Sequence, residues 1–252
     1  MLGWDYTRVF WSQNWALPAV FLAIIGILNT YFVFNWKLFR LLEKEDWENL
    51  ITFLDERIFK KNIIFVQNVR ILVNAYLVRS AIDDIVKLEM HLREKRPKLF
   101  SRLALSFGIP YMLNNNSEEM ERYFKEFLDV RQKDQYWIRW NYAFSLALQE
   151  KQEEAADILA NIAQNTRVSV LLLLTLYLLE SLKMSRPEIM RIIANQTEIL
   201  KKRYSREDWE NEIEKNRNNV QVVILSRLVE EAIDWLFKTD KPVQIQPDST
   251  IH

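Results

Sequence analysis

The stretch that decides the fold lies near the N-terminus, where residues 15–36 read WALPAVFLAIIGILNTYFVFNW. No charged side chain occurs between Arg8 and Lys37. An α-helix rises about 1.5 Å per residue, so about 20 apolar residues cross a hydrocarbon layer about 30 Å thick. Tryptophan favours the headgroup zone of a bilayer, and three tryptophans border the stretch: Trp11, Trp15 and Trp36. We therefore predict a transmembrane helix over residues 15–36, after an N-terminal flank of residues 1–14.

A cleaved signal peptide and a buried core helix are the two alternatives to a membrane anchor for this segment. A signal peptide has a basic start, a shorter apolar run and small residues at its cleavage site. Here only Asp5 and Arg8 are charged before the run, and Phe34-Asn35-Trp36 is a poor cleavage site. A helix buried in a soluble core can also be apolar. The length of the run favours a retained membrane anchor over both.

The basic residues around the segment bear on its orientation. Lys37, Arg40 and Lys44 follow the segment, whereas Arg8 and the terminal amine precede it. Basic flanks favour the cytoplasmic side of a membrane, so charge alone slightly favours a cytoplasmic C-terminal region. Together with the three flanking tryptophans, Lys37 and Arg40 are the residues that we expect at the membrane interface.

The composition excludes several classes of function. The 252 residues include 34 basic and 34 acidic side chains, three glycines and no cysteine. So few glycines cannot supply the phosphate loops of a nucleotide-binding α/β fold. Without cysteine there are no disulfides, thiolate metal sites or cysteine nucleophiles. A neutral net charge argues against a nucleic-acid partner, since binding to phosphates requires an excess of basic residues.

The rest of the chain shows a repeated helical pattern. Amphipathic helices that begin with acidic residues open near Trp47, Ile82, Met120, Ala155 and Ile189, at intervals of 35, 38, 35 and 34 residues. Further apolar helices are expected between them, over residues 63–79, 98–113, 135–149 and 168–183. A two-helix unit that recurs at this interval is typical of an α-solenoid. We predict an all-α protein with such a domain over residues 37–240 and a flexible tail over 241–252.

One apolar run within the repeats differs from the amphipathic helices around it. Residues 168–179 read VSVLLLLTLYLL and carry no charge, with Arg167 before them and Glu180 after them. Twelve residues are too few to span a bilayer. We therefore predict a helix that is buried inside the repeat domain.

One unit has small and large side chains at the spacing of a known repeat: Tyr142, Ala143, Leu146, Ala155 and Leu159. With these residues it resembles the tetratricopeptide (TPR) repeat. Ala143 and Ala155 match the small positions where the two helices of a TPR touch, and Tyr142, Leu146 and Leu159 match its larger core positions. The sequence departs from the TPR pattern at Arg139, which occupies the usual first aromatic site, and at Arg167, which replaces the closing proline. The resemblance covers about 34 residues, and the other units keep its length and periodicity only.

The TPR resemblance implies a binding groove lined by the first helix of each hairpin. The groove positions carried onto this unit are Trp137, Trp140, Phe144 and Ala147, which also share one helix face by their spacing. Aromatic anchors are common among the residues that dominate protein interfaces. Alternatively the rings pack against neighbouring helices, in which case Arg139 and Asn141 on the other side lie at the surface.

The sequence shows no sign of catalysis. Phosphate-binding, nucleophile-elbow and zinc-protease motifs are absent, and the two histidines are His91 and His252. Pairs of acidic residues stand at helix starts, where they interact favourably with the helix dipole. We expect no enzyme activity, no cofactor and no metal site.

The overall plan, with the span running into Phe34-Asn35-Trp36-Lys37 and on to Trp47, resembles membrane-anchored TPR-like proteins of spirochetes. That group is linked to the periplasmic collar of the flagellar motor. The resemblance implies an inner-membrane protein with a periplasmic repeat domain that acts as a scaffold for protein partners in a multi-subunit complex. Two further functions stay open, a chaperone for secretion or envelope assembly and a binder of small apolar ligands in transport. Self-association also stays open.

Overall fold

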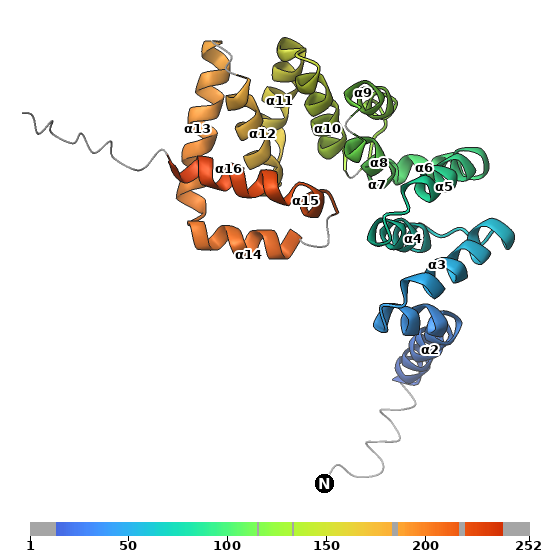
Figure 1. The fold of residues 1–252 in the computed structure, drawn as a ribbon. Coiled ribbons are helices and arrows are strands. Elements are labelled where there is room, and N and C mark those ends of the chain that lie inside the picture. Colours follow the sequence, from blue (N-terminus) through green and yellow to red (C-terminus); the bar gives the residue numbers. More distant parts are fainter. Residues whose placement is uncertain (1–13, 115, 133, 183–185, 217–219, 239–252) are drawn as a thin grey trace, which may run out of the picture. The chain divides into compact units, whose positions relative to one another are not determined.

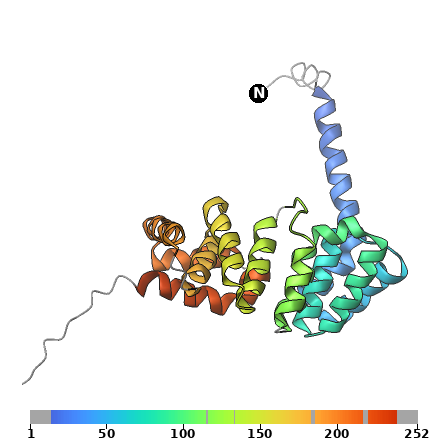
Figure 2. The ribbon, with the colours of Figure 1, turned by 90° about the horizontal axis from the view of Figure 1, so that it is seen from above.

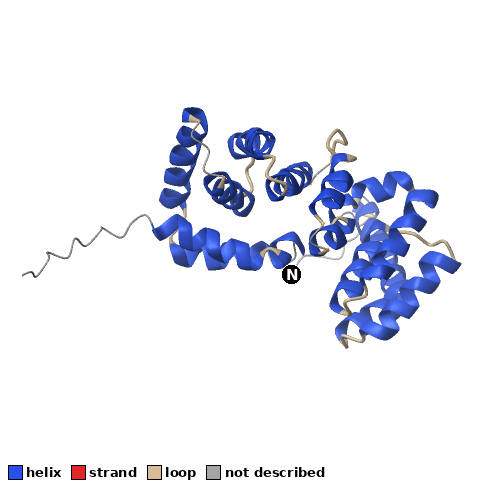
Figure 3. Ribbon diagram, turned by 45° about the horizontal axis from the view of Figure 1, so that its top comes forward, coloured by secondary structure: helices blue, strands red, loops and turns tan. Residues whose placement is uncertain are grey.

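The computed structural model describes residues 14–114, 116–132, 134–182, 186–216 and 220–238. These ranges contain helices and connecting loops and no strand, as Figure 3 shows. One apolar helix lies at the N-terminal end. Trp11, most of the predicted N-terminal flank and the predicted tail at residues 241–252 lie outside the described residues. The chain forms two compact units that divide between Ala81 and Ile82, and each is described by itself.

The first unit is built around α2 (Ala16–Glu43), which combines the apolar segment with a packed end. The apolar part of α2 is long enough to span a membrane and contains no buried residue, and Figure 2 shows it projecting from its unit. The helix continues seven residues beyond Trp36, and Leu38 in this extension is buried. A single helix therefore carries both the apolar segment and part of the core of the first unit.

Three further helical segments complete the first unit. They are α3 (Trp47–Asp55), the π-helical turn η1 (Glu56–Lys60) and α4 (Val66–Val78). The α3 helix packs against both α2 and α4. Asp46 caps α3, because its carboxylate accepts a hydrogen bond from the backbone N–H of Asn49. Leu50, Leu54 and Ile58 line the buried face of α3 and η1 at helical spacing.

The second unit begins with α5 (Ile82–Lys95), which packs against three short helices. They are α6 (Pro97–Arg102), α7 (Ala104–Phe107) and α8 (Ile109–Leu113). The sequence predicted one helix over residues 98–113, so this prediction is wrong in detail. Pro110 lacks a backbone N–H and its ring clashes with the preceding turn, so a continuous helix cannot pass this point without distortion. The next helix, α9 (Ser117–Lys125), packs against α8.

Four longer helices follow, each packed against the next. They are α10 (Gln135–Leu148), α11 (Gln152–Asn165), α12 (Ser169–Ser181) and α13 (Pro187–Arg203). α11 also packs against α13, and α9 packs against α10. Ala143 and Ala155 are fully buried in the α10–α11 hairpin, where small side chains allow the two helices to approach closely.

Most of the apolar run at residues 168–179 is buried, as predicted, although Val168 at its start is exposed. It forms most of α12, and eight consecutive residues from Ser169 to Leu176 are buried. The chain then continues through α14 (Arg206–Asn216) and α15 (Val220–Ile224) into α16 (Ser226–Lys238). α16 packs against α12 and α13 (Figure 1). The C-terminal helices thus cover a side of α12 that α11 and α13 leave open.

Three helices end in the same kind of turn at regularly spaced positions. Glu45, Ser80 and Glu150 have positive φ angles of 51°, 55° and 61°. In each turn the following backbone N–H bonds to a carbonyl five residues earlier, as when Lys151 donates to Leu146 over 3.0 Å. This is the Schellman cap that ends many helices. Ser80 lies 35 residues after Glu45, and Glu150 lies 70 residues after Ser80. The same turn therefore recurs at multiples of 35 residues.

Candidate partner-binding site

The aromatic stripe predicted to line a groove lies on α10, and its two tryptophans are buried. Trp137 is 4% exposed and Trp140 is 0% exposed. Trp140 stacks on Phe144 with 5.2 Å between ring centroids. Phe144 and Ala147 are half-buried. The tryptophans therefore pack against neighbouring helices, which is the alternative to a groove, and only Phe144 and Ala147 keep part of their side chains at the surface.

Asn141, predicted at the surface, lies in the core, so that prediction is wrong. Its side chain is 0% exposed, and its amide Nδ2 donates to Gln221 Oε1 over 3.1 Å and to the Trp137 carbonyl over 2.8 Å. Gln221, on α15, in turn donates to the carbonyl of Leu105 over 3.4 Å. The face of α10 that bears Asn141 is covered by a helix 80 residues further along the chain, which local periodicity cannot reveal.

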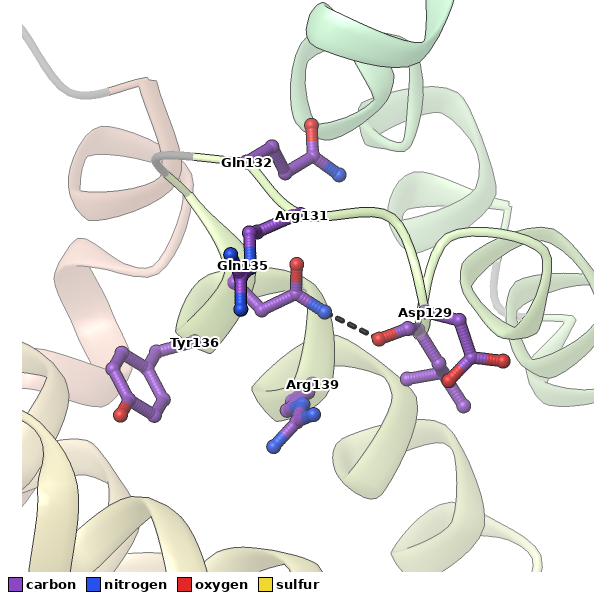
Figure 4. A pocket seen from close by; sticks show the side chains of 7 residues that line it. Asp129, Arg131, Gln132, Gln135, Tyr136 and Arg139 are labelled. Atoms are coloured by element: carbon purple, nitrogen blue, oxygen red, sulfur yellow. Dashed lines mark hydrogen bonds between the residues drawn. The ribbon is translucent and has the colours of Figure 1, made fainter.

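A polar pocket lies between the end of α9 and the start of α10 (Figure 4). Its volume is about 370 Å³. The residues that line it come from the connecting loop and the first two turns of α10, and they are Leu128, Asp129, Arg131, Gln132, Gln135, Tyr136 and Arg139. Gln135 holds the loop to the helix, because its Nε2 donates to the carbonyl of Leu128. This hydrogen bond thus fixes the loop that forms one wall of the pocket.

The chemistry of this pocket suits an anionic group. Among the residues that the structure describes, Arg131 and Arg139 form no ion pair. Gln132 Nε2 is a buried donor with no hydrogen-bond partner in the described part of the chain. A guanidinium presents several N–H donors in a plane, a geometry that matches a carboxylate or a phosphate. Asp129 at the rim adds one opposing charge.

Only a weak indication of this pocket exists in the sequence. Arg139 departs from the TPR pattern at a site that is usually aromatic, and a break in periodicity occurs at Lys133-Asp134. Arg131, Gln132 and Gln135 sit around that break. Polar residues beside a break usually mark a solvated loop, so only the folded loop shows that they face a common hollow.

A second cluster of charged groups lies on α5 and is fully satisfied. Glu89 is buried, and its carboxylate accepts hydrogen bonds from Arg93 at 2.8 Å and from Tyr111 at 3.2 Å. Arg93 also bonds to Glu126 at 2.7 Å, and its guanidinium lies over the ring of Phe100. Burial raises the pKa of Glu89, although Arg93 opposes the shift. Burial and the adjacent Glu89 raise the pKa of Tyr111 to about 12.

This cluster joins elements and does not present a reactive group. Each of its hydrogen-bonding side chains contacts another helix or the segment that follows α9. Tyr111 also stacks on Tyr123 with 4.4 Å between ring centroids. We assign the cluster to the stability of the second unit. Within the described ranges, no group of three or more His, Cys, Asp and Glu side chains could hold a metal ion.

Of the residues predicted at the membrane interface, Trp36, Lys37 and Arg40 lie on α2, and Trp15 directly precedes it. Trp15 and Trp36 are 68% and 66% exposed, and Lys37 and Arg40 are exposed as well. Lys37 directly follows Trp36, and its ammonium lies 5.0 Å from the centre of the Phe53 ring on α3. The end of the apolar segment is therefore in direct contact with the first packed hairpin.

Comparison with known proteins identifies relatives in one genus. A family model described as "Uncharacterised Treponema protein" matches residues 84–238, from α5 to the end of α16. A protein of Treponema pallidum (strain Nichols), described as "Uncharacterized protein", is 25% identical over 247 residues. The match covers 93% of this chain and 78% of the relative. No solved structure matches the chain.

Proposed function

Because the chain belongs to the family described as "Uncharacterised Treponema protein", and because α2 is long and apolar enough to cross a bilayer, we propose that it is a membrane-anchored scaffold for protein partners. The observation that carries this proposal is the continuity of α2. Its exposed apolar part runs without a break into residues that pack against α3, such as Leu38. A retained anchor explains this continuity, because one helix then holds the packed hairpin at the bilayer.

The packing of the second unit supports a helical-repeat domain. α10 and α11 form a hairpin with small residues at their contact, and α11 packs on α13 of the following pair. Contact between equivalent helices of successive pairs is what an α-solenoid requires. The turns at Glu45, Ser80 and Glu150 recur at multiples of 35 residues, which is close to the length of a TPR. We propose that these hairpins are TPR-like repeats.

The proposed contact with a partner is the pocket lined by Arg131 and Arg139, together with the half-buried Phe144 and Ala147. A carboxylate of a partner protein supplies the charge that the two guanidinium groups lack. The scaffold acts by placement, since the span raises its effective concentration for proteins assembled in the same membrane. It needs no catalytic step and no cofactor.

The resemblance to spirochete proteins gives the proposal a cellular setting. The name of the family refers to Treponema, which is a genus of spirochetes. We therefore propose an inner-membrane protein whose repeat domain lies in the periplasm and takes part in the assembly of the flagellar motor collar.

The proposal is tested by crosslinking the tagged full-length chain in intact membranes and identifying captured proteins by mass spectrometry. The key variant is Arg131→Gln/Arg139→Gln, and its matched control is Arg102→Gln/Arg122→Gln at two exposed arginines. We expect the wild type and the control to capture the same partners, and the key variant to lose about tenfold in yield. Equal capture by all three proteins would show that the pocket is not the contact. Failure of the wild type to capture any protein would contradict the scaffold.

A further inference from the structure

We propose that the first unit binds anionic phospholipid headgroups through four basic residues: Lys37, Arg57, Lys60 and Lys61. The inference rests on the proposed anchoring of α2 in a membrane and adds a lipid-binding site to it. It concerns the leaflet on the C-terminal side of the span, whichever compartment that side faces.

The position of Lys37 along α2 places this site at the bilayer surface. Lys37 is the first residue beyond Trp36, so its backbone lies about 1.5 Å further along the helix axis than the last interfacial tryptophan. Its exposed ammonium reaches the Phe53 ring of α3. The part of α3 near Phe53 therefore lies at the depth of the headgroups when α2 spans the bilayer.

The guanidinium of Arg57 lies close to the same ring. The Arg57 guanidinium is 5.3 Å from the centre of the Phe53 ring, so Lys37 and Arg57 are no more than about 10 Å apart, a distance comparable to the Debye length at about 0.1 M salt. Arg57 and Lys60 belong to the single π-helical turn η1, and Lys61 follows it directly. Lys37 and Arg57 thus share the Phe53 ring, and Lys60 and Lys61 follow Arg57 by three and four residues, within about one helical turn.

In the part of the chain that the structure describes, only one of the four cations, Lys61, is paired with an acidic group. Lys61 pairs with Glu56 at 3.0 Å, and Asp55 accepts a hydrogen bond from Tyr76 on α4. Among the residues that the structure describes, Lys37, Arg57 and Lys60 form no ion pair. The ion pair with Lys61 lowers the pKa of Glu56 most, and the charges of Lys60 and Lys37 lower it further.

The aromatic residues of this region also favour a surface that contacts lipid. Phe59 lies within η1 between the cations and is 37% exposed, and Trp36 is 66% exposed. Basic side chains combined with exposed aromatic rings are typical of protein surfaces at a lipid interface. Because the anchor holds this surface beside the headgroups, their effective concentration is high. An anionic lipid is therefore the ligand that fits, and lipid phosphate supplies the missing negative charge.

The first experiment measures lysine reactivity in the full chain, reconstituted into nanodiscs of phosphatidylcholine alone or mixed with phosphatidylglycerol. Acetylation of each lysine is followed by mass spectrometry. We expect Lys60 and Lys61 to react about fivefold more slowly with phosphatidylglycerol present. Exposed lysines of the second unit, Lys98 and Lys125, serve as references that keep their rates. The protection is expected to fade in about 1 M salt, where screening is strong.

The second experiment counts phospholipids that stay bound to the detergent-purified chain, by native mass spectrometry. We expect the wild type to retain phosphatidylglycerol in preference to phosphatidylcholine. Lys60→Gln/Lys61→Gln is expected to weaken this preference about tenfold, whereas the control Lys98→Gln/Lys125→Gln keeps it. All four side chains are exposed, so circular dichroism is expected to show the same fold for both variants.

The outcomes separate the lipid site from the anchor. A chain that resists extraction by alkaline wash but shows no preference for phosphatidylglycerol would overturn the lipid site and leave the anchor intact. Equal protection of Lys60 and Lys61 by inorganic phosphate alone would also overturn it, because the ligand would then be a free anion. A chain that is removed by alkaline wash would overturn the anchor and the lipid site together.

Discussion

The side-chain amide of Asn141 on α10 donates a hydrogen bond to Gln221 on α15, with 3.1 Å between nitrogen and oxygen and both side chains buried. These residues are 80 positions apart. Gln221 also donates to the Leu105 carbonyl on α7. Three helices that are distant in the sequence are therefore joined by one chain of hydrogen bonds between buried amides.

Removing one of the two hydrogen-bonded amide side chains is expected to destabilise the protein. Gln221→Leu leaves the Asn141 amide buried with one partner fewer, which costs about 1–3 kcal/mol. Adding Asn141→Leu removes the second polar group as well, so the double variant is expected to recover part of the loss. Urea unfolding of the full chain measures both effects, and Gln152→Leu at an exposed position serves as control. A Gln221→Leu variant as stable as the control would contradict a stabilising role for the amide chain.

A substitution in the turn at Glu150 is expected to stabilise the protein. A non-glycine residue in the left-handed region costs about 1–2 kcal/mol, and Glu150 has a φ of 61°. Glu150→Gly removes that cost but adds about 0.4–1 kcal/mol of chain entropy lost on folding. We expect a net stabilisation of about 0.5–1 kcal/mol in thermal unfolding. Asn161→Gly, at an exposed site inside α11, is expected to destabilise instead, and an equal effect of both changes would rule out the turn as the cause.

The regular helices could be predicted well from the sequence because their signals are local. Residues 63–79, 135–149 and 168–183 are expected to be helical, and the structure has helices over Val66–Val78, Gln135–Leu148 and Ser169–Ser181. Apolar periodicity and breaker residues are properties of a few neighbouring positions. These signals therefore locate an element to within about three residues without any knowledge of its neighbours.

The candidate site was less predictable because burial depends on distant segments. The face of α10 with Trp137 and Trp140 looks like a binding stripe by spacing, yet neighbouring helices cover it. Asn141 looks like a surface residue by polarity, yet α15 covers it. Conversely, Arg131 and Arg139 share a hollow only because the loop after α9 folds back towards α10. None of these outcomes follows from the local pattern of residues.

Gly108 gives a third prediction, at the junction of α7 and α8. A Cβ atom placed there would lie 2.3 Å from Cζ of Phe124 and 2.7 Å from its Cε1. Phe124 is fully buried, and protein interiors are closely packed, so Gly108→Ala is expected to force a shift of packed atoms that costs about 1–3 kcal/mol. The double variant Gly108→Ala/Phe124→Leu is expected to lose less stability than the two single variants lose together. Additive losses in urea unfolding would show that the two positions do not clash.

The free energy of unfolding contributed by Glu89 is expected to fall as the pH rises, whereas the contribution of an exposed, ion-paired carboxylate falls as the pH is lowered. Burial raises its pKa above 4.5, the ordinary value. The folded chain therefore holds this proton more tightly than the unfolded chain, so the stabilisation is complete below pH 4.5 and is lost as the pH rises through the folded pKa. For Glu94, Lys95 lowers the pKa, and the corresponding stabilisation is lost as the pH falls below 4.5.

Replacing each of these carboxyl groups by an amide separates the two effects. Between pH 4.5 and pH 7 the wild type is expected to lose stability with rising pH relative to Glu89→Gln, since the variant has no titrating group at this buried site. Glu94→Gln is expected to differ in slope from the wild type only below pH 4.5. The measurement is the free energy of unfolding in urea at a series of pH values. Parallel curves for the wild type and Glu89→Gln above pH 4.5 would contradict a raised pKa of Glu89. The absolute stability of the variant does not matter for this test, because loss of the bond to Arg93 shifts the free energy of unfolding at every pH without changing its slope.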